Sequence, residues 1–418
     1  MRHYGTGAAR SQKRAEKPEL GDPICRSSLG ACMRNASRAI RTLLLAVLGG
    51  PSVSADEIRA AWYNFYRLPP LREQAEPLMQ THVRALRSMG INRLYVLVKT
   101  PDGFVFFDSR RVPLWSAEMV SPQGRKVRVG LDWDPLAGLI ALGGRHGIDV
   151  RPYVNVFCEG GEDAEDRPRN PLLTDRPEWA VQNRLGQRLG WASPAIPQVV
   201  DYELGILLEI AARYDIRGIQ LDRIRMPSGT EEAGAETRTV RGKRVTLPAP
   251  VDYNPETVRR FRVRAGRPPA GDDDPEWVRF RQDLVSDFVA QAGRELKRAK
   301  PGLSLSVSVF PDPAAAARQQ FQDWERWARE GWVDEICTMA YVTPAAAWEE
   351  LVRREQAAAG GRAVLLPGIG AHAFDRPEQL EGHIAAARRA GAPGYILFNA
   401  FSLFEKKGFH AALMGMNR

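Results

Sequence analysis

The chain is poor in cysteine and has no long apolar run. Its 418 residues include only four Cys, which excludes a small fold held together by disulfides. The apolar stretch 43–48 is too short to cross a bilayer as a helix, so no stable membrane span is expected. Hydrophobic residues make up 44% and charged residues 26% of the chain. These ordinary proportions exclude a disordered chain and indicate a globular protein.

Several motifs of well-known enzyme classes are absent. The sequence has no Walker motif, no G-x-S-x-G turn and no Cys–His pair that would indicate a nucleophile. No spacing of His, Cys and Asp matches a zinc site. The sequence therefore predicts neither a metal nor a cofactor. Cys158 and Cys337 lie in apolar runs, and we interpret both as small buried hydrophobic residues.

Positive charge is in excess, but it is concentrated in the first 55 residues. The formal net charge is +9. Residues 1–55 contain nine Lys/Arg and three Asp/Glu, so they carry six of the nine surplus charges. A nucleic-acid-binding surface should place its basic residues on the folded domain. The sequence therefore argues against a nucleic-acid partner.

The segment 33–55 has the pattern of a secretory signal. Three arginines precede the apolar stretch 43–48, and small residues follow at 53–55. We expect translation to start at Met33, cleavage after Ala55, and residues 1–32 to be an upstream extension. The predicted mature chain, 56–418, is one extracytoplasmic domain. Two alternatives are a buried helix over 40–55 and a lipoprotein cleavage box at 29–32.

Short apolar runs alternate with helical patterns along the rest of the chain. Eight runs rich in Val, Ile, Tyr and Phe predict strands at 59–66, 93–99, 149–157, 218–224, 304–310, 335–342, 363–369 and 394–400. The predicted helices are 71–89, 135–146, 197–213, 275–298, 324–330, 345–358, 377–390 and 408–416. Eight such units in about 360 residues predict a TIM (β/α)8 barrel. A doubly wound open sheet is the alternative, but no G-x-G-x-x-G follows its first strand.

Loop lengths differ between the two ends of this predicted barrel. The connections that enter strands are short, whereas those leaving the second, third and fourth strands are long: 100–134, 158–196 and 225–274. A short helix is expected at 255–265 in the last of these. Active sites of such barrels are built from the loops that follow strands. The long loops therefore predict a cleft for an extended substrate.

Asp222 is the first candidate for catalysis. It ends the fourth strand, on the same face as Gln220. A carboxylate at this position can act as nucleophile, base or charge stabiliser, and the nearby Arg223 or Arg225 would keep it ionised. Gln220, Arg223 and Arg225 are therefore predicted to line the substrate site. The alternative is a buried salt bridge that closes the barrel.

Two residues compete for the role of second carboxylate. Asp312 follows the fifth strand, and Phe310 and Pro311 would partly desolvate it, which suits an acid with a raised pKa. Glu159 follows the third strand in a more polar loop, so Asp312 is favoured over Glu159. Asp312 could equally be a turn or helix cap. Glu335 opens the sixth strand at the opposite end and is predicted to be structural.

Aromatic residues are expected around the barrel mouth. Tyr341 follows the sixth strand, Trp62 lies in the first, and His372 follows the seventh and could donate to a ligand. Flat rings with a polar edge suit sugar rings. Further rings predicted near the mouth are Tyr63, Phe65, Tyr66, Trp115, Tyr153, Trp179, Trp191 and Phe401.

Short motifs in a fixed order resemble the glycosyl-hydrolase-like 10 domain of bacterial envelope proteins. The stretch YDIRGIQLDRIRMP resembles its strand-four signature, and PYVN at 152–155 and RPEW at 176–179 resemble further segments. The resemblance covers about residues 57–404. It implies a β/α barrel with glycosidase chemistry on an envelope polysaccharide. Of the family's functional residues, the resemblance implies a counterpart at Asp222 first and then at Asn155 in the substrate site. Arg223 stands where some members have a second Asp.

Three functions are consistent with these observations. The first is a secreted glycoside hydrolase that uses carboxylate acid/base or nucleophile chemistry on an envelope polysaccharide such as peptidoglycan glycan strands. The second is a barrel that binds glycan without cleaving it. The third is a barrel enzyme acting on a phosphorylated small molecule, which the predicted signal and the lack of a Gly-rich phosphate loop disfavour.

Overall fold

The computed structural model describes residues 57–120, 124–160, 171–240 and 243–417. The predicted signal segment 33–55 and the extension 1–32 lie outside these residues. Within the described part of the chain, no helix combines the length and the apolar character needed to cross a membrane.

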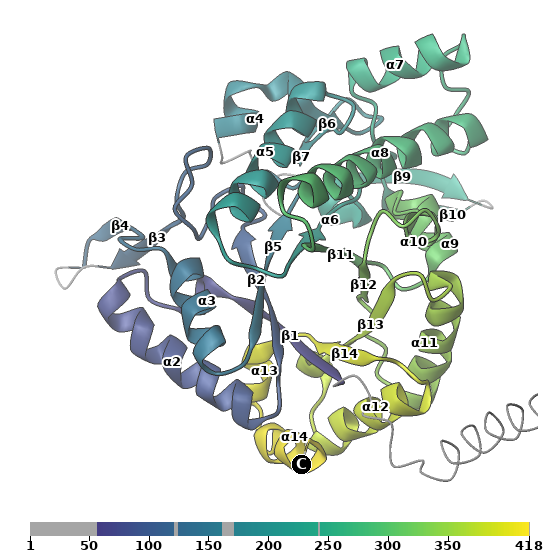
Figure 1. Cartoon of the computed structure of the whole chain (residues 1–418). Coiled ribbons are helices and arrows are strands. Elements are labelled where there is room, and N and C mark those ends of the chain that lie inside the picture. The colour runs from purple at the N-terminus through teal and green to yellow at the C-terminus, as the bar shows by residue number, and fades with distance from the viewer. Residues whose placement is uncertain (1–56, 121–123, 161–170, 241–242, 418) are drawn as a thin grey trace, which may run out of the picture. The chain divides into compact units, whose positions relative to one another are not determined.

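Eight parallel strands close into a barrel, as the sequence predicts (Figure 1). The order around the barrel is β1-β14-β13-β12-β11-β8-β5-β2. Their bounds are β1 Ile58–Asn64, β2 Arg93–Lys99, β5 Asp149–Asn155, β8 Gly218–Asp222, β11 Ser304–Val309, β12 Glu335–Thr338, β13 Val364–Ile369 and β14 Gly394–Leu397. Each strand follows the previous one around the ring, which makes the fold a TIM barrel.

Helices cover the outside of this barrel and start within one residue of the predicted positions, except for α13, which was not predicted. The longer ones are α2 Arg72–Ser88, α3 Pro135–Arg145, α5 Pro197–Arg213, α8 Pro275–Ala299, α11 Ala345–Ala359 and α12 Pro377–Arg389. Shorter ones are α10 Trp324–Arg329, α13 Ala400–Glu405 and α14 Phe409–Met416. Proline occupies the first turn of α3, α5, α8 and α12, where its missing N–H costs nothing. Asp134 and Asp274 accept backbone N–H groups at the starts of α3 and α8.

The three long loops contain structure of their own. The first holds the hairpin β3 Ser116–Val120 with β4 Lys126–Gly130. The second holds α4 Pro171–Asp175, the short helix η2 Pro177–Trp179, and the hairpin β6 Ala180–Gln182 with β7 Arg188–Ala192. The third holds α6 Gly229–Ala233, the hairpin β9 Ala235–Val240 with β10 Lys243–Pro248, and α7 Pro255–Ala265. Figure 1 shows the elements of the second and third loops on the same side of the barrel as β5 and α8.

Strand alternation divides the apolar residues into an inner and an outer core. Inside the barrel, Trp62, Tyr95 and Cys337 are buried together with small and aliphatic residues. The residues of opposite parity, such as Tyr63 and Val96, pack outward against the helices in the main core. Cys158 and Cys337 are both buried and form no disulfide, which confirms their interpretation as small buried hydrophobic residues.

The amino ends of the strands are closed by a buried ionic network. Glu335 of β12 accepts hydrogen bonds from Arg93 at 3.0 Å, Arg151 at 2.8 Å and the Tyr95 hydroxyl at 2.6 Å. Arg151 also binds Asp149 at 2.8 Å. These side chains come from β2, β5 and β12, so the network ties strands together across the barrel. Glu335 is structural, as its place at the start of β12 predicts.

Candidate active site at the carboxyl ends of the strands

Asp222 and Asn155 lie side by side at the mouth of the barrel. They are the last residues of β8 and β5, and they pair in register. Asp222 is half-buried, and its Oδ1 accepts the backbone N–H of Arg223 at 2.8 Å. Arg223 has φ +49°, in the left-handed region that costs a residue with a Cβ about 1 kcal/mol or more. A strained residue directly after a mouth carboxylate is typical of a functional site.

Arg223 and Arg225 are joined by a carboxylate that the sequence analysis missed. Glu232 of α6 accepts hydrogen bonds from Arg223 at 2.7 Å and from Arg225 at 2.6 and 2.8 Å. Burial raises the pKa of Glu232, but the hydrogen bonds and charges of Arg225 and Arg223 outweigh it and lower that pKa overall. The Arg225 guanidinium also lies 4.8 Å from the Trp191 ring centre. These contacts fix the loop that follows Asp222.

Rings from three other strands line the mouth. Tyr341 lies 6.5 Å from Trp62 and 5.1 Å from Phe398, measured between ring centres. His372 is exposed, with its ring 5.4 Å from that of Tyr341. Below them, the Trp62 indole N–H donates to Gln220 Oε1 at 2.8 Å inside the barrel. Trp62, Gln220, Tyr341 and His372 therefore share one region, whereas Tyr63, Phe65 and Phe401 pack in the outer core.

Tyr341 lies close enough to Asp222 for the two groups to interact electrostatically. Burial, and after it the negative charge of Asp222, raises the pKa of Tyr341 well above its usual range. The phenol therefore keeps its proton at neutral pH. It can donate a hydrogen bond to an oxygen atom of a ligand at the mouth.

Glu159 lies beneath the mouth in a buried ionic cluster. Its carboxylate contacts the Lys99 ammonium, which also donates to Glu203 of α5 at 2.9 and 3.0 Å. The same ammonium donates to the backbone oxygens of Asn155 at 2.9 Å and Val156 at 3.0 Å. Burial raises the pKa of Glu203 well above its usual range, against the opposing charge of Lys99. Since Glu159 is fully buried, this placement favours a structural role in which the cluster holds Asn155.

Asp312 is exposed and caps a short helix. Its side chain accepts the backbone N–H of Ala315 at 2.8 Å, at the start of α9 Pro313–Ala315. Phe310 and Pro311 are only half-buried themselves, so the desolvation expected from them is not found around Asp312. The capping alternative therefore describes the observed contacts.

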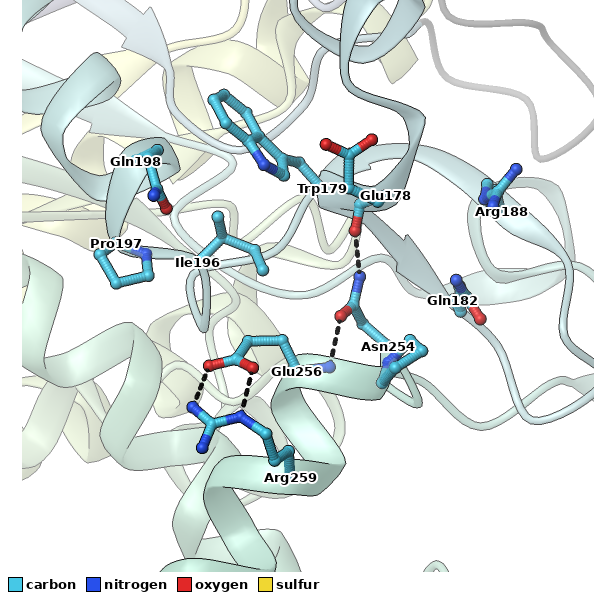
Figure 2. A pocket seen from close by; sticks show the side chains of 11 residues that line it. Glu178, Trp179, Gln182, Arg188, Ile196, Pro197, Gln198, Asn254, Glu256 and Arg259 are labelled. Atoms are coloured by element: carbon cyan, nitrogen blue, oxygen red, sulfur yellow. Dashed lines mark hydrogen bonds and ion pairs between the residues drawn. The ribbon is translucent and has the colours of Figure 1, made fainter.

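A pocket of about 630 Å³ lies between the second and third long loops. Figure 2 shows Trp179, Ile196 and Gln198 on one side, Gln182 and Arg188 on another, and the Glu256–Arg259 ion pair below. Asn254 joins the walls, because its side-chain amide donates to the Glu178 backbone oxygen at 2.8 Å. Sequence reasoning placed only Trp179 near the mouth and did not identify this pocket.

The described residues show no metal site of the usual kind. No three side chains of His, Cys, Asp or Glu form a group there that could hold an ion. The groups gathered at the mouth are a carboxylate, amides, a phenol and aromatic rings. This set suits hydrogen bonding to sugar hydroxyls and stacking on sugar rings.

Comparisons with known proteins agree with this arrangement. The family model described as Glycosyl hydrolase-like 10 matches residues 57–369, which confirms the resemblance seen in the short motifs. The chain is 26% identical over 278 residues to a curated protein named glycosyl hydrolase DigH from Escherichia coli K12. That alignment covers 61% of this chain and 56% of the curated protein. The chain therefore spans about half the length of the curated relatives it matches.

Solved structures of glycosidases share the fold. An alpha-L-fucosidase isoenzyme 2 from Paenibacillus thiaminolyticus superposes with a TM-score of 0.57 at 16% identity, covering 86% of this chain and 48% of that chain. The catalytic domain of a beta-amylase from Paenibacillus polymyxa gives 0.57 at 12% identity, covering 88% and 100%. At these identities the likeness shows the β/α barrel alone.

Proposed function

The chain belongs to the Glycosyl hydrolase-like 10 family, and from that membership we propose that it is a secreted glycoside hydrolase acting on envelope polysaccharide, with peptidoglycan glycan strands as substrate. The observation that carries the proposal is the position of Asp222. It is a half-buried carboxylate at the carboxyl end of a barrel strand, beside Asn155 and close to Tyr341. Carboxylates at this end of the barrel belong to the face where such enzymes carry out their chemistry.

In this proposal the residues at the mouth have distinct roles. Asp222 supplies the negative charge that attacks the sugar or activates water, or stabilises the positive charge that develops on the ring. Tyr341 donates a hydrogen bond to a sugar oxygen, and Asn155 orients a hydroxyl. His372 borders the ring, and the buried Trp62, which Gln220 holds, supports Tyr341 from below. The Arg223–Glu232–Arg225 cluster fixes the loop that carries Asp222.

A glycosidase usually needs a second carboxyl group to protonate the leaving oxygen. Asp312 and Glu159 were the predicted candidates, but Asp312 caps a helix and Glu159 is buried beside Lys99. This observation favours the alternative function, a barrel that binds glycan without cleaving it. The hydrolase remains the main proposal because Asp222 and its aromatic surroundings resemble a reaction site.

One experiment separates the two functions. Purified protein is incubated with denuded and with peptide-bearing peptidoglycan glycans, and the products are read by mass spectrometry. Hydrolysis predicts shortened strands with one water added per cut, and the anomeric form of the new end reports retention or inversion. Intact strands that co-sediment with the protein would support the binding function instead.

The extracytoplasmic location is part of the proposal. It rests on the signal pattern of residues 33–55. Amino-terminal sequencing of the native protein is expected to start at Asp56. A protein recovered from the cytoplasm with residues 40–55 intact would contradict it.

A further inference from the structure

We propose that the pocket between the second and third long loops is a second saccharide-binding subsite, which holds a non-reacting sugar of the same polysaccharide. This inference rests on the proposed function, since it assigns the pocket to the substrate of the barrel mouth. The pocket is about 630 Å³, within the range of roughly 300–1,000 Å³ typical of small-molecule sites.

The walls of the pocket come from segments far apart in the sequence, and buried hydrogen bonds hold them together. Asn254 is buried, and its amide nitrogen donates to the backbone oxygens of Glu178 and Ala180, both at 2.8 Å. Its side-chain oxygen accepts the backbone N–H of Glu256 at 2.9 Å. One side chain therefore ties η2 and β6 to the start of α7. The pocket is preorganised, so binding does not have to order it.

A second buried cluster fixes the same walls from behind. Asp252 is fully buried and accepts the hydroxyls of Ser193 at 2.7 Å and Thr257 at 2.8 Å. Ser193 precedes α5, whose first turn lines the pocket, and Thr257 lies in α7. The three wall segments are thus connected through polar groups that are shielded from solvent, where hydrogen bonds hold geometry well.

The lining combines an aromatic ring with side-chain amides. Trp179 is half-buried, and Gln182 and Gln198 lie on different sides of the pocket (Figure 2). An indole face packs against the C–H face of a sugar, and primary amides both donate to and accept from hydroxyl groups. This combination matches a saccharide ring.

The charges of the lining favour a neutral sugar. Glu256 and Arg259 form a two-bond ion pair, with both distances 2.6 Å, and so neutralise each other. The remaining charged residues, Glu178 and Arg188, have opposite signs. With no net charge, the pocket offers little attraction to a carboxylate, so an uncharged sugar unit of the strand, lying between the units that carry ionised carboxylates, is the better fit.

One hairpin connects the pocket to the mouth. Arg188 at the start of β7 lines the pocket, whereas Trp191 near its end packs against Arg225, three residues after Asp222. The Glu159 backbone N–H donates to Gly190, and that of Ala192 to Phe157, both at 2.8 Å. β7 is therefore bonded to the chain that leaves β5, and it connects a wall of the pocket to the loop that follows Asp222. A glycan strand longer than the mouth could contact both.

The test compares how short and long glycan strands bind to a protein that cannot cleave them. Binding of denuded peptidoglycan glycan strands, short and long, is measured with the full chain carrying Asp222→Asn. Adding Trp179→Leu, which removes the ring and keeps apolar volume, is expected to weaken binding of long strands roughly 3–10-fold and to leave short strands unchanged. Gln198→Ala and Arg188→Ala, both at exposed positions, should weaken the same long strands by smaller factors.

Trp332→Leu is the matched control. Trp332 is also half-buried beneath an arginine, with the Arg326 guanidinium 5.1 Å from its ring centre, as Arg176 lies 5.7 Å from that of Trp179. It lies just before β12, at the amino end of the barrel, so the change should not affect binding of either strand length. If Trp179→Leu lowers the melting temperature strongly, the binding data of Gln198→Ala and Arg188→Ala decide whether the pocket binds sugar.

The outcomes distinguish this inference from the proposed function. Unchanged affinity for long strands in the pocket variants, or equal losses for short and long strands, would overturn the subsite even if the wild-type protein cleaves glycan. Absence of binding at every length would overturn it as well. A length-dependent loss of binding, combined with a wild-type protein that cleaves no glycan, would support the subsite and contradict the hydrolase.

Discussion

The two ends of the barrel use ionisable side chains in different ways. At the amino end, Glu335 is buried and bonded to Arg93, Arg151 and Tyr95. At the carboxyl end, Asp222 is half-buried and next to a residue with a left-handed backbone. A satisfied buried network stabilises a fold, whereas an accessible carboxylate in a strained turn is suited to meet a ligand. The same functional group, a carboxylate, thus serves stability at one end and, in our proposal, chemistry at the other.

An acid-to-amide change at the amino end should give the largest effect, and the effect should be on stability. Glu335→Gln removes the charge that pairs with the half-buried Arg93 and the buried Arg151, which should cost about 3 kcal/mol of unfolding free energy. Urea denaturation measures this loss, and kcat per folded molecule should stay the same. A stable variant with reduced kcat would break the contrast between the two ends.

The same change at the carboxyl end should affect catalysis and not folding. Asp222→Asn is nearly isosteric and is expected to lower kcat by roughly 100-fold or more, through loss of nucleophilic or acid–base assistance. Its melting temperature should match the wild type. Retained kcat would exclude a catalytic role, and loss of folding would support the salt-bridge alternative.

Removing one tyrosine hydroxyl at each end of the barrel should give the same contrast between catalysis and stability, with smaller effects. Tyr341→Phe should lower kcat about tenfold through the loss of one hydrogen bond to substrate, with little change in stability. Tyr95→Phe removes the hydroxyl that donates to Glu335 and should cost about 1.5–3 kcal/mol of stability with kcat unchanged.

The pH profile adds a check on Tyr341. Because the pKa of Tyr341 is raised well above its usual range, its phenol stays protonated through about pH 10, where an ordinary tyrosine is half ionised. The ratio of wild-type to Tyr341→Phe activity should therefore be constant between neutral pH and that limit. A ratio that falls near pH 8 would contradict the assignment.

The smallest expected effect concerns the backbone after Asp222. Arg223→Gly and Arg223→Ala lose the same ion pair with Glu232, but only glycine adopts φ +49° without strain. The glycine variant should be more stable than the alanine variant by about 1 kcal/mol, despite its greater freedom when unfolded. Thermal denaturation of the two proteins gives the difference, and a more stable alanine variant would mean that the turn is not strained.

The sequence predicted the barrel well because local signals determine most of it. β2 begins and ends at the predicted residues 93 and 99, and α5 and α7 match their predicted ranges 197–213 and 255–265. The two helices start at a proline. Strand alternation placed Gln220 on the same face as Asp222, and the structure shows it inside the barrel, where it accepts the Trp62 indole N–H. Several predicted strands ran up to four residues too far at their carboxyl ends, as at 335–342 for β12. The reason is that apolar residues continue into the mouth after the hydrogen bonds between strands end.

The contacts around the site depend on distant partners and could not be predicted in the same way. Lys99 ends an apolar strand, but its partner Glu203 lies 104 residues further along the chain. Glu232 is one of two adjacent glutamates in a loop, and nothing local indicates that it joins Arg223 and Arg225. Asp312 carried a correct capping signal, Asp-Pro before a short helix, which competed with its interpretation as an acid.

A crystal structure of the Asp222→Asn protein with a denuded glycan oligosaccharide tests the central claim most directly. The account predicts a sugar ring at the mouth, with an atom of the scissile linkage within hydrogen-bonding distance of residue 222 and the ring bordered by Tyr341 and His372. Sugar bound only outside the mouth, or a ring that does not contact residue 222, would contradict the claim that the carboxyl end of this barrel is its reaction site.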